Sequence, residues 1–179
     1  MIVQKSFENN ILDSERLNRN LSFYATFIAV YENMRMYVDE HIKSLYIEES
    51  QCRNGKVEYK YSTGYYDKIK NCIVDDKGNK CVTKASFLWL VEQGAITNDE
   101  YDLFIEIKEK RNCFAHQLLN LLFEDVKMND KALFARMVEL YKSIDKWWIE
   151  TFDEINDENP HSIIVDLIDI IAEQIIEKK

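Results

Sequence analysis

Three polar side chains close together in the chain form its strongest candidate for chemistry: Arg111, Asn112 and His116, in the segment Arg-Asn-Cys-Phe-Ala-His. A guanidinium stays charged and presents a planar fork to phosphate oxygens. An imidazole exchanges protons near neutral pH. Cleaving RNA without a metal needs a base for the ribose 2′-OH, an acid for the leaving 5′ oxygen and a cation for the crowded phosphorane. His116 fits the acid or base and Arg111 fits the cation, while Asn112 can orient His116 or hold the scissile phosphate.

The spacing of these residues limits how one helix can present them. Asn112 and His116 are four residues apart and therefore share a face. Arg111 and His116 are five apart, which separates them by about 140° around the helix axis. One helix cannot point both at one small target without distortion, but a second copy of the helix can supply the missing group. The alternative interpretation of the spacing is a surface Arg beside a hydrogen-bonded core His.

A helix over residues 97–123 is predicted to carry the three side chains. Thr97 and Glu100 form a capping box at its start. Asp99 and Glu100 also lie where the helix dipole favours negative charge. Apolar residues then recur with helical period, and the polar group interrupts this stripe. The stripe comprises Leu103, Phe104, Ile107, Phe114, Leu118, Leu121 and Leu122.

This stretch resembles the HEPN domain family, whose signature on a helix is an Arg, a short spacer and a His, commonly with a polar residue after the Arg. The lead-in Gly94-Ala95-Ile96-Thr97, followed by an acidic turn and Tyr101, is also similar to that of many members. The resemblance covers about residues 84–123 closely and the rest only as a helical pattern. It implies a metal-independent endoribonuclease in which Arg and His from two protomers meet at a dimer interface.

The resemblance also implies a biological setting and a set of partners. It suggests a toxin or phage-defence effector that acts as a homodimer on RNA, with no cofactor and no metal, and with an antitoxin protein as partner. The alternative is a non-catalytic HEPN-like module for binding or assembly. The intact pair of Arg111 and His116 favours the enzyme, and the acidic balance of the chain favours the alternative.

Composition favours a helical protein of ordinary size. The 179 residues suit one domain over 1–179, and only four Gly and one Pro favour long helices over a turn-rich β protein. No apolar run is long enough for a membrane span, and the N-terminus lacks the pattern of a signal peptide, so a cytoplasmic protein is expected. The net charge of −9 argues against a nonspecific nucleic-acid coat. The four cysteines match no zinc spacing.

The expected fold is all-α, an up-and-down helical bundle of four to five main helices with an irregular insertion at about 49–83. Besides the central helix, helices are predicted at about 14–48 with a kink or break, at 84–93 with Thr83 as cap and Gly94 as stop, at 130–155, and from Asn159-Pro160 to about 177. The last helix carries more apolar residues than one packed face needs. It is therefore expected to lie centrally or to be shared with another chain.

The insertion combines basic residues with tyrosines. Within it, Lys56–Tyr61 alternates like a strand, and Thr63–Cys72 suits a short helix. Single-stranded RNA stacks its bases on aromatic rings and needs cations for its phosphates. This pattern predicts RNA contacts, whereas the alternative is a solvated loop whose tyrosines pack on the bundle. The predicted RNA-binding residues are Lys56, Lys60, Lys68 and Lys70 in the insertion and Lys108 and Lys110 beside the motif.

Overall fold

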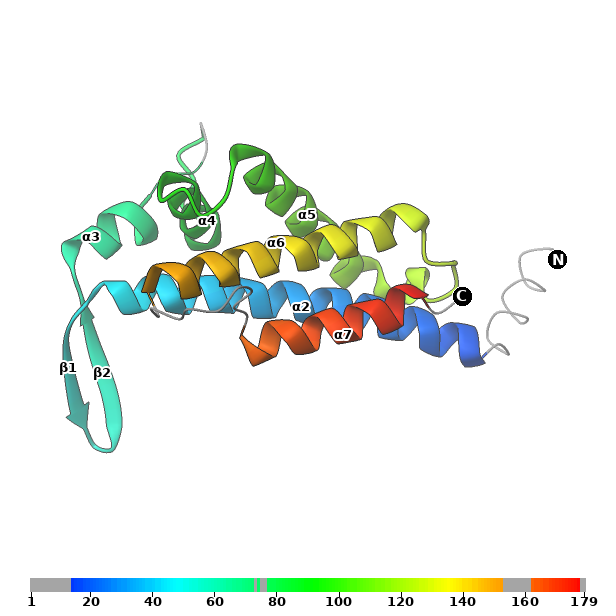
Figure 1. Cartoon of the computed structure of the whole chain (residues 1–179), viewed down its shortest axis with the longest axis horizontal. Helices are drawn as coiled ribbons and strands as arrows, with labels where there is room; N and C mark the ends of the chain where they lie inside the picture. The colour runs from blue at the N-terminus through cyan, green and yellow to red at the C-terminus, as the bar shows by residue number, and fades with distance from the viewer. Residues whose placement is uncertain (1–13, 73, 75–76, 153–161, 178–179) are drawn as a thin grey trace. The chain divides into compact units, whose positions relative to one another are not determined.

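The computed structural model describes residues 14–72, 74, 77–152 and 162–177. Helices dominate this part of the chain, and a two-stranded sheet is its one sheet, so the prediction of a mostly α-helical bundle is confirmed (Figure 1). Within the described residues no helix has the length and apolar character needed to cross a membrane. The elements are α2 (Ser14–Leu45), β1 (Ile47–Arg53), β2 (Lys56–Tyr61), α3 (Thr63–Tyr65), η1 (Tyr66–Lys70), α4 (Val82–Glu92), α5 (Asn98–Leu121), α6 (Met128–Phe152) and α7 (Ile163–Glu177).

The chain divides into two compact units, which are described one at a time. The first unit comprises the residues up to Glu32 and those from Asp102 onward, and the second unit is Asn33–Tyr101. The helices α2 and α5 each contribute residues to both units. The candidate residues of α5 all lie in the first unit.

Four helices of the first unit run in alternating directions, in the order α2, α5, α6 and α7 (Figure 1). An aromatic cluster holds three of them together. The ring of Phe114 on α5 lies 4.9 Å from Phe27 on α2, and both Phe23 and Phe27 lie 5.8 Å from Phe134 on α6. Edge-on and tilted ring pairs at these distances add to the stabilisation from apolar burial. The core of this unit therefore sits directly beneath the middle of α5.

The long helix α2 differs from the prediction in two ways. It runs as one continuous helix of 32 residues, so the predicted break is wrong. Its buried face is also rotated from the apolar stripe that its sequence predicts, because Leu21 and Leu45 of that stripe are both 42% exposed. The predicted stripe is Leu17, Leu21, Tyr24, Ile28, Tyr31, Val38, Ile42 and Leu45. The buried side chains instead include Asn20, which is fully shielded from solvent. The buried set on α2 is Asn20, Phe23, Tyr24, Phe27, Val30, Tyr31, Met34, Val38, Asp39 and Ile42.

The second unit contains the predicted insertion, and its first part, up to Lys70, forms regular strands and helical turns rather than an irregular loop. An antiparallel hairpin of β1 and β2 pairs Arg53 with Lys56, leaving Asn54 and Gly55 as a two-residue loop. Both loop residues have positive φ, 53° and 74°, as a type I′ turn requires. The Asn-Gly pair is the sequence signal for this turn. The predicted strand Lys56–Tyr61 is confirmed, and the predicted short helix appears as α3 and η1.

Helix ends follow local rules in two of the predicted places. The capping box is confirmed, since the Thr97 N–H donates to Glu100 Oε2 at 2.7 Å and the Glu100 N–H donates to Thr97 Oγ1 at 3.2 Å. Gly94 ends α4 with φ 74°, and the Gly94 and Ala95 N–H groups reach back to α4 carbonyls in a Schellman motif. The predicted cap Thr83 is wrong, because α4 begins at Val82 with Cys81 before it. The predicted start at Asn159-Pro160 lies outside the described residues.

Candidate functional site on helix α5

Arg111 is held by three contacts, two of them with α2. Its Nη2 forms an ion pair with Glu32 Oε1, and its Nη1 donates to Asn112 Oδ1 at 3.0 Å. The guanidinium carbon also lies 5.7 Å from the centre of the buried Tyr31 ring. The Arg111 and Glu32 side chains are 29% and 30% exposed, so the pair is partly shielded. A guanidinium over an aromatic ring is held in place by the ring, while its exposed edge stays available to an anion.

His116 occupies a different environment from Arg111. It is exposed, and within the described residues it makes no hydrogen bond or ion pair that fixes its ring. The Asn112 carbonyl accepts from Arg111, so that oxygen is not orienting His116. The structure therefore brings Arg111 and Asn112 together and leaves His116 apart on the same helix. This is the separation that the five-residue spacing predicts for a single helix, and the alternative of a hydrogen-bonded core His does not describe His116.

The packed face of α5 near Lys110 and Phe114 is anchored by a buried charge and by aromatic packing. Lys110 Nζ contacts Asp130 Oδ1 at 2.7 Å, and the Asp130 side chain is only 4% exposed. Lys110 also lies 5.3 Å from the Phe114 ring, which packs on Tyr24 at 4.8 Å. Burial raises the pKa of Tyr24 to about 12, with Asp130 as the next contributor. Lys110 is thus engaged in holding α5 to α6, which reduces its availability for the predicted contact with RNA.

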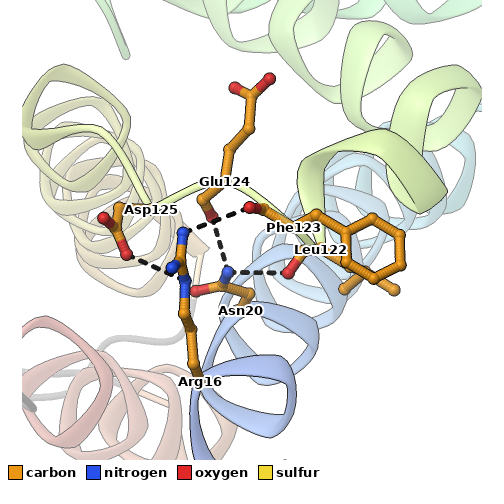
Figure 2. A network of polar contacts seen from close by, with 6 residues as sticks. All are labelled: Arg16, Asn20, Leu122, Phe123, Glu124 and Asp125. Carbon is orange, nitrogen blue, oxygen red and sulfur yellow. Dashed lines mark hydrogen bonds and ion pairs between the residues drawn. The ribbon is translucent and has the colours of Figure 1, made fainter. Parts of the chain in front are cut away.

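The C-terminal end of α5 is clamped by two side chains from the first turns of α2 (Figure 2). Asn20 Nδ2 donates to the carbonyls of Leu122 at 3.0 Å and Glu124 at 2.6 Å. Arg16 Nη2 donates to the Phe123 carbonyl at 3.2 Å, and Arg16 Nε lies 3.2 Å from Asp125 Oδ1. Backbone carbonyls in a turn need donors when water is excluded. This clamp fixes the turn after α5 and so limits movement of the helix end that carries His116.

Sequence reasoning missed Glu32, Tyr31 and Asn20 as parts of this region. A signal existed for Asn20, because it falls on the buried stripe of α2 one turn before Phe23 and Tyr24, and a buried Asn needs partners. Tyr31 was predicted as core, but its contact with Arg111 depends on how α2 and α5 pack. Glu32 carries no local signal, since an acidic residue at the edge of a helix stripe is usually solvated.

The predicted RNA-binding lysines of the second unit lie on the hairpin and on η1. Lys56, Lys68 and Lys70 are exposed, whereas Lys60 pairs with Glu49 at 3.3 Å across the two strands. Lys70 Nζ lies 5.0 Å from the Tyr66 ring. A chain of tyrosine rings links the hairpin to η1. The consecutive ring distances are 6.5 Å for Tyr59 and Tyr61, 5.0 Å for Tyr61 and Tyr65, and 5.7 Å for Tyr65 and Tyr66.

These tyrosines differ in exposure. Tyr65 is buried and anchors the series, which matches the interpretation of tyrosines packed on helices. Tyr59 and Tyr66 are 50% and 37% exposed, which leaves ring faces for a stacked base. Lys108, in the first unit, is half-buried and has contacts of its own. The hairpin is therefore the better of the two predicted RNA surfaces.

Comparison with known proteins adds no relative. No family model, no curated protein and no solved structure matches the chain significantly. Within the described residues, no group of three or more His, Cys, Asp or Glu side chains is placed to hold a metal ion.

Proposed function

We propose that the chain is a metal-independent endoribonuclease of HEPN type that cleaves RNA by attack of the ribose 2′-OH. The observation that carries the proposal is that α5 presents both a positioned cation and an exposed imidazole. Arg111 is a positioned, partly exposed cation, and His116 is an exposed imidazole five residues later on the same anchored helix. These are the two group types that the reaction needs.

Each group has a defined task in the reaction. One imidazole takes the proton of the 2′-OH, and the 2′ oxygen then attacks the adjacent phosphorus. The bond from phosphorus to the 5′ oxygen breaks, and a second imidazole gives that oxygen a proton. Arg111 stabilises the extra negative charge on the phosphorane oxygens. The products are a 2′,3′-cyclic phosphate and a 5′-OH, and DNA is not a substrate because it lacks the 2′-OH.

A two-fold dimer supplies two imidazoles and solves the separation of Arg111 and His116. In a two-fold interface, a residue of one copy that contacts a second residue of the other copy does so twice, once in each direction. The α5 helices of two chains lying antiparallel then place Arg111 of one chain near His116 of the other. The Glu32 carboxylate holds Arg111 in the free protein, and a substrate phosphate replaces it as the partner of the guanidinium.

The proposed biological role is that of a toxin or phage-defence effector in the cytoplasm, where its RNA substrate is found. Such an enzyme must be controlled, which implies an antitoxin protein as the neutralising partner. The exposed tyrosines and lysines of the hairpin and of η1 are proposed to hold single-stranded RNA. This assigns Tyr59, Tyr66, Lys56, Lys68 and Lys70 to binding rather than to catalysis.

A second candidate function is a non-catalytic HEPN-like binding or assembly module. The ion pair between Arg111 and Glu32 favours it, because that pair neutralises the cation that catalysis would use. The net charge of −9 also favours it, since it repels RNA at long range. In this case Arg111 joins α5 to α2, and His116 is an ordinary surface residue.

The experiment that separates the two functions is RNA cleavage in the presence of EDTA. The full chain is incubated with a labelled single-stranded RNA and with a matched RNA that has 2′-deoxy sugars throughout. The proposal predicts cleavage of the first substrate alone, with 2′,3′-cyclic phosphate ends. Cleavage that needs a divalent metal, or cleavage of the 2′-deoxy strand, would contradict the mechanism. No cleavage across a panel of cellular RNAs would favour the non-catalytic module.

A further inference from the structure

Helix α7 is firmly docked by one face and carries an apolar stripe on the other. Val165, Ile168 and Ala172 are buried in the first unit. Lys142 on α6 pairs with Asp169 at 3.0 Å, and Lys131 Nζ donates to the Ile176 carbonyl at 3.0 Å. In the part of the chain that the structure describes, the opposite side is exposed. Its large apolar residues are Ile163 at 87% exposure, Ile164 at 53%, Leu167 at 55% and Ile170 at 54%.

The exposed apolar residues have the spacing of a helix-pairing seam. Ile163, Leu167 and Ile170 follow one another at steps of four and three, and Gln174 continues the pattern with another step of four. Steps of this kind align side chains along one line of a helix and accept the knobs of a second helix. An isolated exposed Ile needs no explanation, but a continuous line of them on an anchored helix marks an interaction surface. The expected occupant is therefore a helix.

The two borders of this seam differ in charge. On one border, Asp166 and Glu173 are seven residues apart, and both are exposed. On the other border lie Ile164 and Ile171. Asp169, another acid of the helix, is already paired with Lys142 and is not part of the seam. One side of the surface is thus acidic and uncompensated, and the other side is apolar.

This charge pattern decides between occupants. A second copy of α7 packed antiparallel would set its acidic border against the same acidic border. A second copy packed parallel would set the acids against isoleucines. Neither arrangement supplies a counter-charge, because α7 from Ile163 to Glu177 contains no Lys or Arg. Like charges at these flanking positions oppose pairing, and opposite charges select the partner and its orientation.

We propose that this face of α7 binds an amphipathic helix of another protein, one with an apolar seam and with Lys or Arg along one border. The basic border lies against Asp166 and Glu173, and the apolar seam covers Ile163, Leu167 and Ile170. This interaction does not depend on RNA cleavage, and the acids of the face repel RNA. It therefore stands or falls separately from the proposed enzymatic function.

The test uses the full chain and two synthetic helical peptides of the same length. Both carry Leu at seam positions, and one carries Lys where the other carries Glu. Binding is measured by fluorescence anisotropy at two salt concentrations. The expected result is at least about tenfold tighter binding of the Leu/Lys peptide, with the advantage shrinking at high salt. Equal binding of the two peptides, or no binding of either, would overturn the proposal.

Variants of α7 locate the interaction. Leu167→Ser with Ile170→Ser should abolish binding of the Leu/Lys peptide, and Asp166→Asn with Glu173→Gln should remove its advantage over the Leu/Glu peptide. Met128→Ser is the matched control, because Met128 is 78% exposed on another helix of the same unit. Unchanged binding in the α7 variants would overturn the proposal. So would a wild-type dimer that the Leu167→Ser, Ile170→Ser protein dissociates in sedimentation, since a second copy would then cover the face.

Discussion

Helix α7 and the part of α5 from Asp102 onward belong to the same unit, and each is packed by one face, but their outward faces differ in kind. The outward side of α5 presents Asn112 and His116, with the guanidinium of Arg111 partly exposed. The outward side of α7 presents Ile163, Leu167 and Ile170. The buried faces are alike, because both obey the same need to remove apolar surface from water. The outward faces are free of that need, so their residue types carry the information about function.

The largest expected effect distinguishes chemistry from packing on α5. His116→Ala should reduce RNA cleavage by about 10²- to 10⁴-fold, the usual contribution of a general acid or base. It should leave thermal stability unchanged because His116 is exposed. Cleavage kinetics in EDTA and a melting curve check both parts. Asn120→Ala, an exposed change on the same face, is the control. Full activity in the His116 variant would remove His116 from the mechanism.

The next effect compares the two faces of α7. Ile168→Ala should lower the free energy of unfolding by about 2–4 kcal/mol, because Ile168 is 8% exposed and leaves a cavity. Ile170→Ala should change it by no more than about 0.5 kcal/mol, because Ile170 is 54% exposed. Urea denaturation measures both values. Similar losses in the two variants would mean that Ile170 is covered in solution.

A pH effect reports on Tyr24, the buried tyrosine of α2 that packs on Phe114 of α5. The pKa of Tyr24 is about 12 in the folded chain, against 10.0 normally, so both states keep the proton below pH 10. Between about pH 10 and 12 the unfolded chain ionises first, and folding stability falls by about 2 kcal/mol on this account. Tyr24→Phe should therefore show a shallower loss in alkaline denaturation. Identical pH slopes for the two proteins would show that Tyr24 is accessible.

The smallest effect concerns the acid that restrains Arg111. Glu32→Gln should raise RNA affinity by about two- to fivefold, since a phosphate no longer competes with the Glu32 carboxylate. The cost in stability should stay below about 1 kcal/mol, as for other partly exposed ion pairs. Filter binding at fixed salt measures the affinity. Glu109→Gln on α5 makes the same change of charge at an exposed position, and an equal gain there would reduce the effect to net charge.

The helical elements followed from the sequence because their signals are local. The capping box at Thr97, the stop at Gly94 and the apolar period of α6 each need only neighbouring residues. The hairpin turn at Asn54-Gly55 had an equally local signal, but the segment was predicted as an irregular insertion and not as a hairpin. The rotation of the buried face of α2 could not be predicted in the same way. Leucines at its edge have the same period as its core, and which face is buried is decided by distant helices.

The candidate site shows the same difference between local signals, which could be predicted, and long-range contacts, which could not. The positions of Arg111 and His116 on one helix, and their separation around its axis, followed from spacing alone. The restraint of Arg111 by Glu32 did not, since the two residues are far apart in sequence and meet only when α2 packs on α5. The clamp of Asn20 on the turn after α5 is also a long-range contact. The candidate chemical groups could thus be predicted from the sequence, whereas the residues of other helices that contact them could not.

The central claim is that one active site combines Arg111 from one chain with His116 from another. The most direct measurement mixes Arg111→Ala protein with His116→Ala protein under conditions that let protomers exchange, and then follows RNA cleavage in EDTA. We expect each variant alone to be inactive and the mixture to recover part of the wild-type rate, because mixed dimers keep one Arg111 opposite one His116 and water can protonate the leaving oxygen in place of the second imidazole. A mixture as inactive as its components, beside a fully active wild type, would contradict the two-chain site.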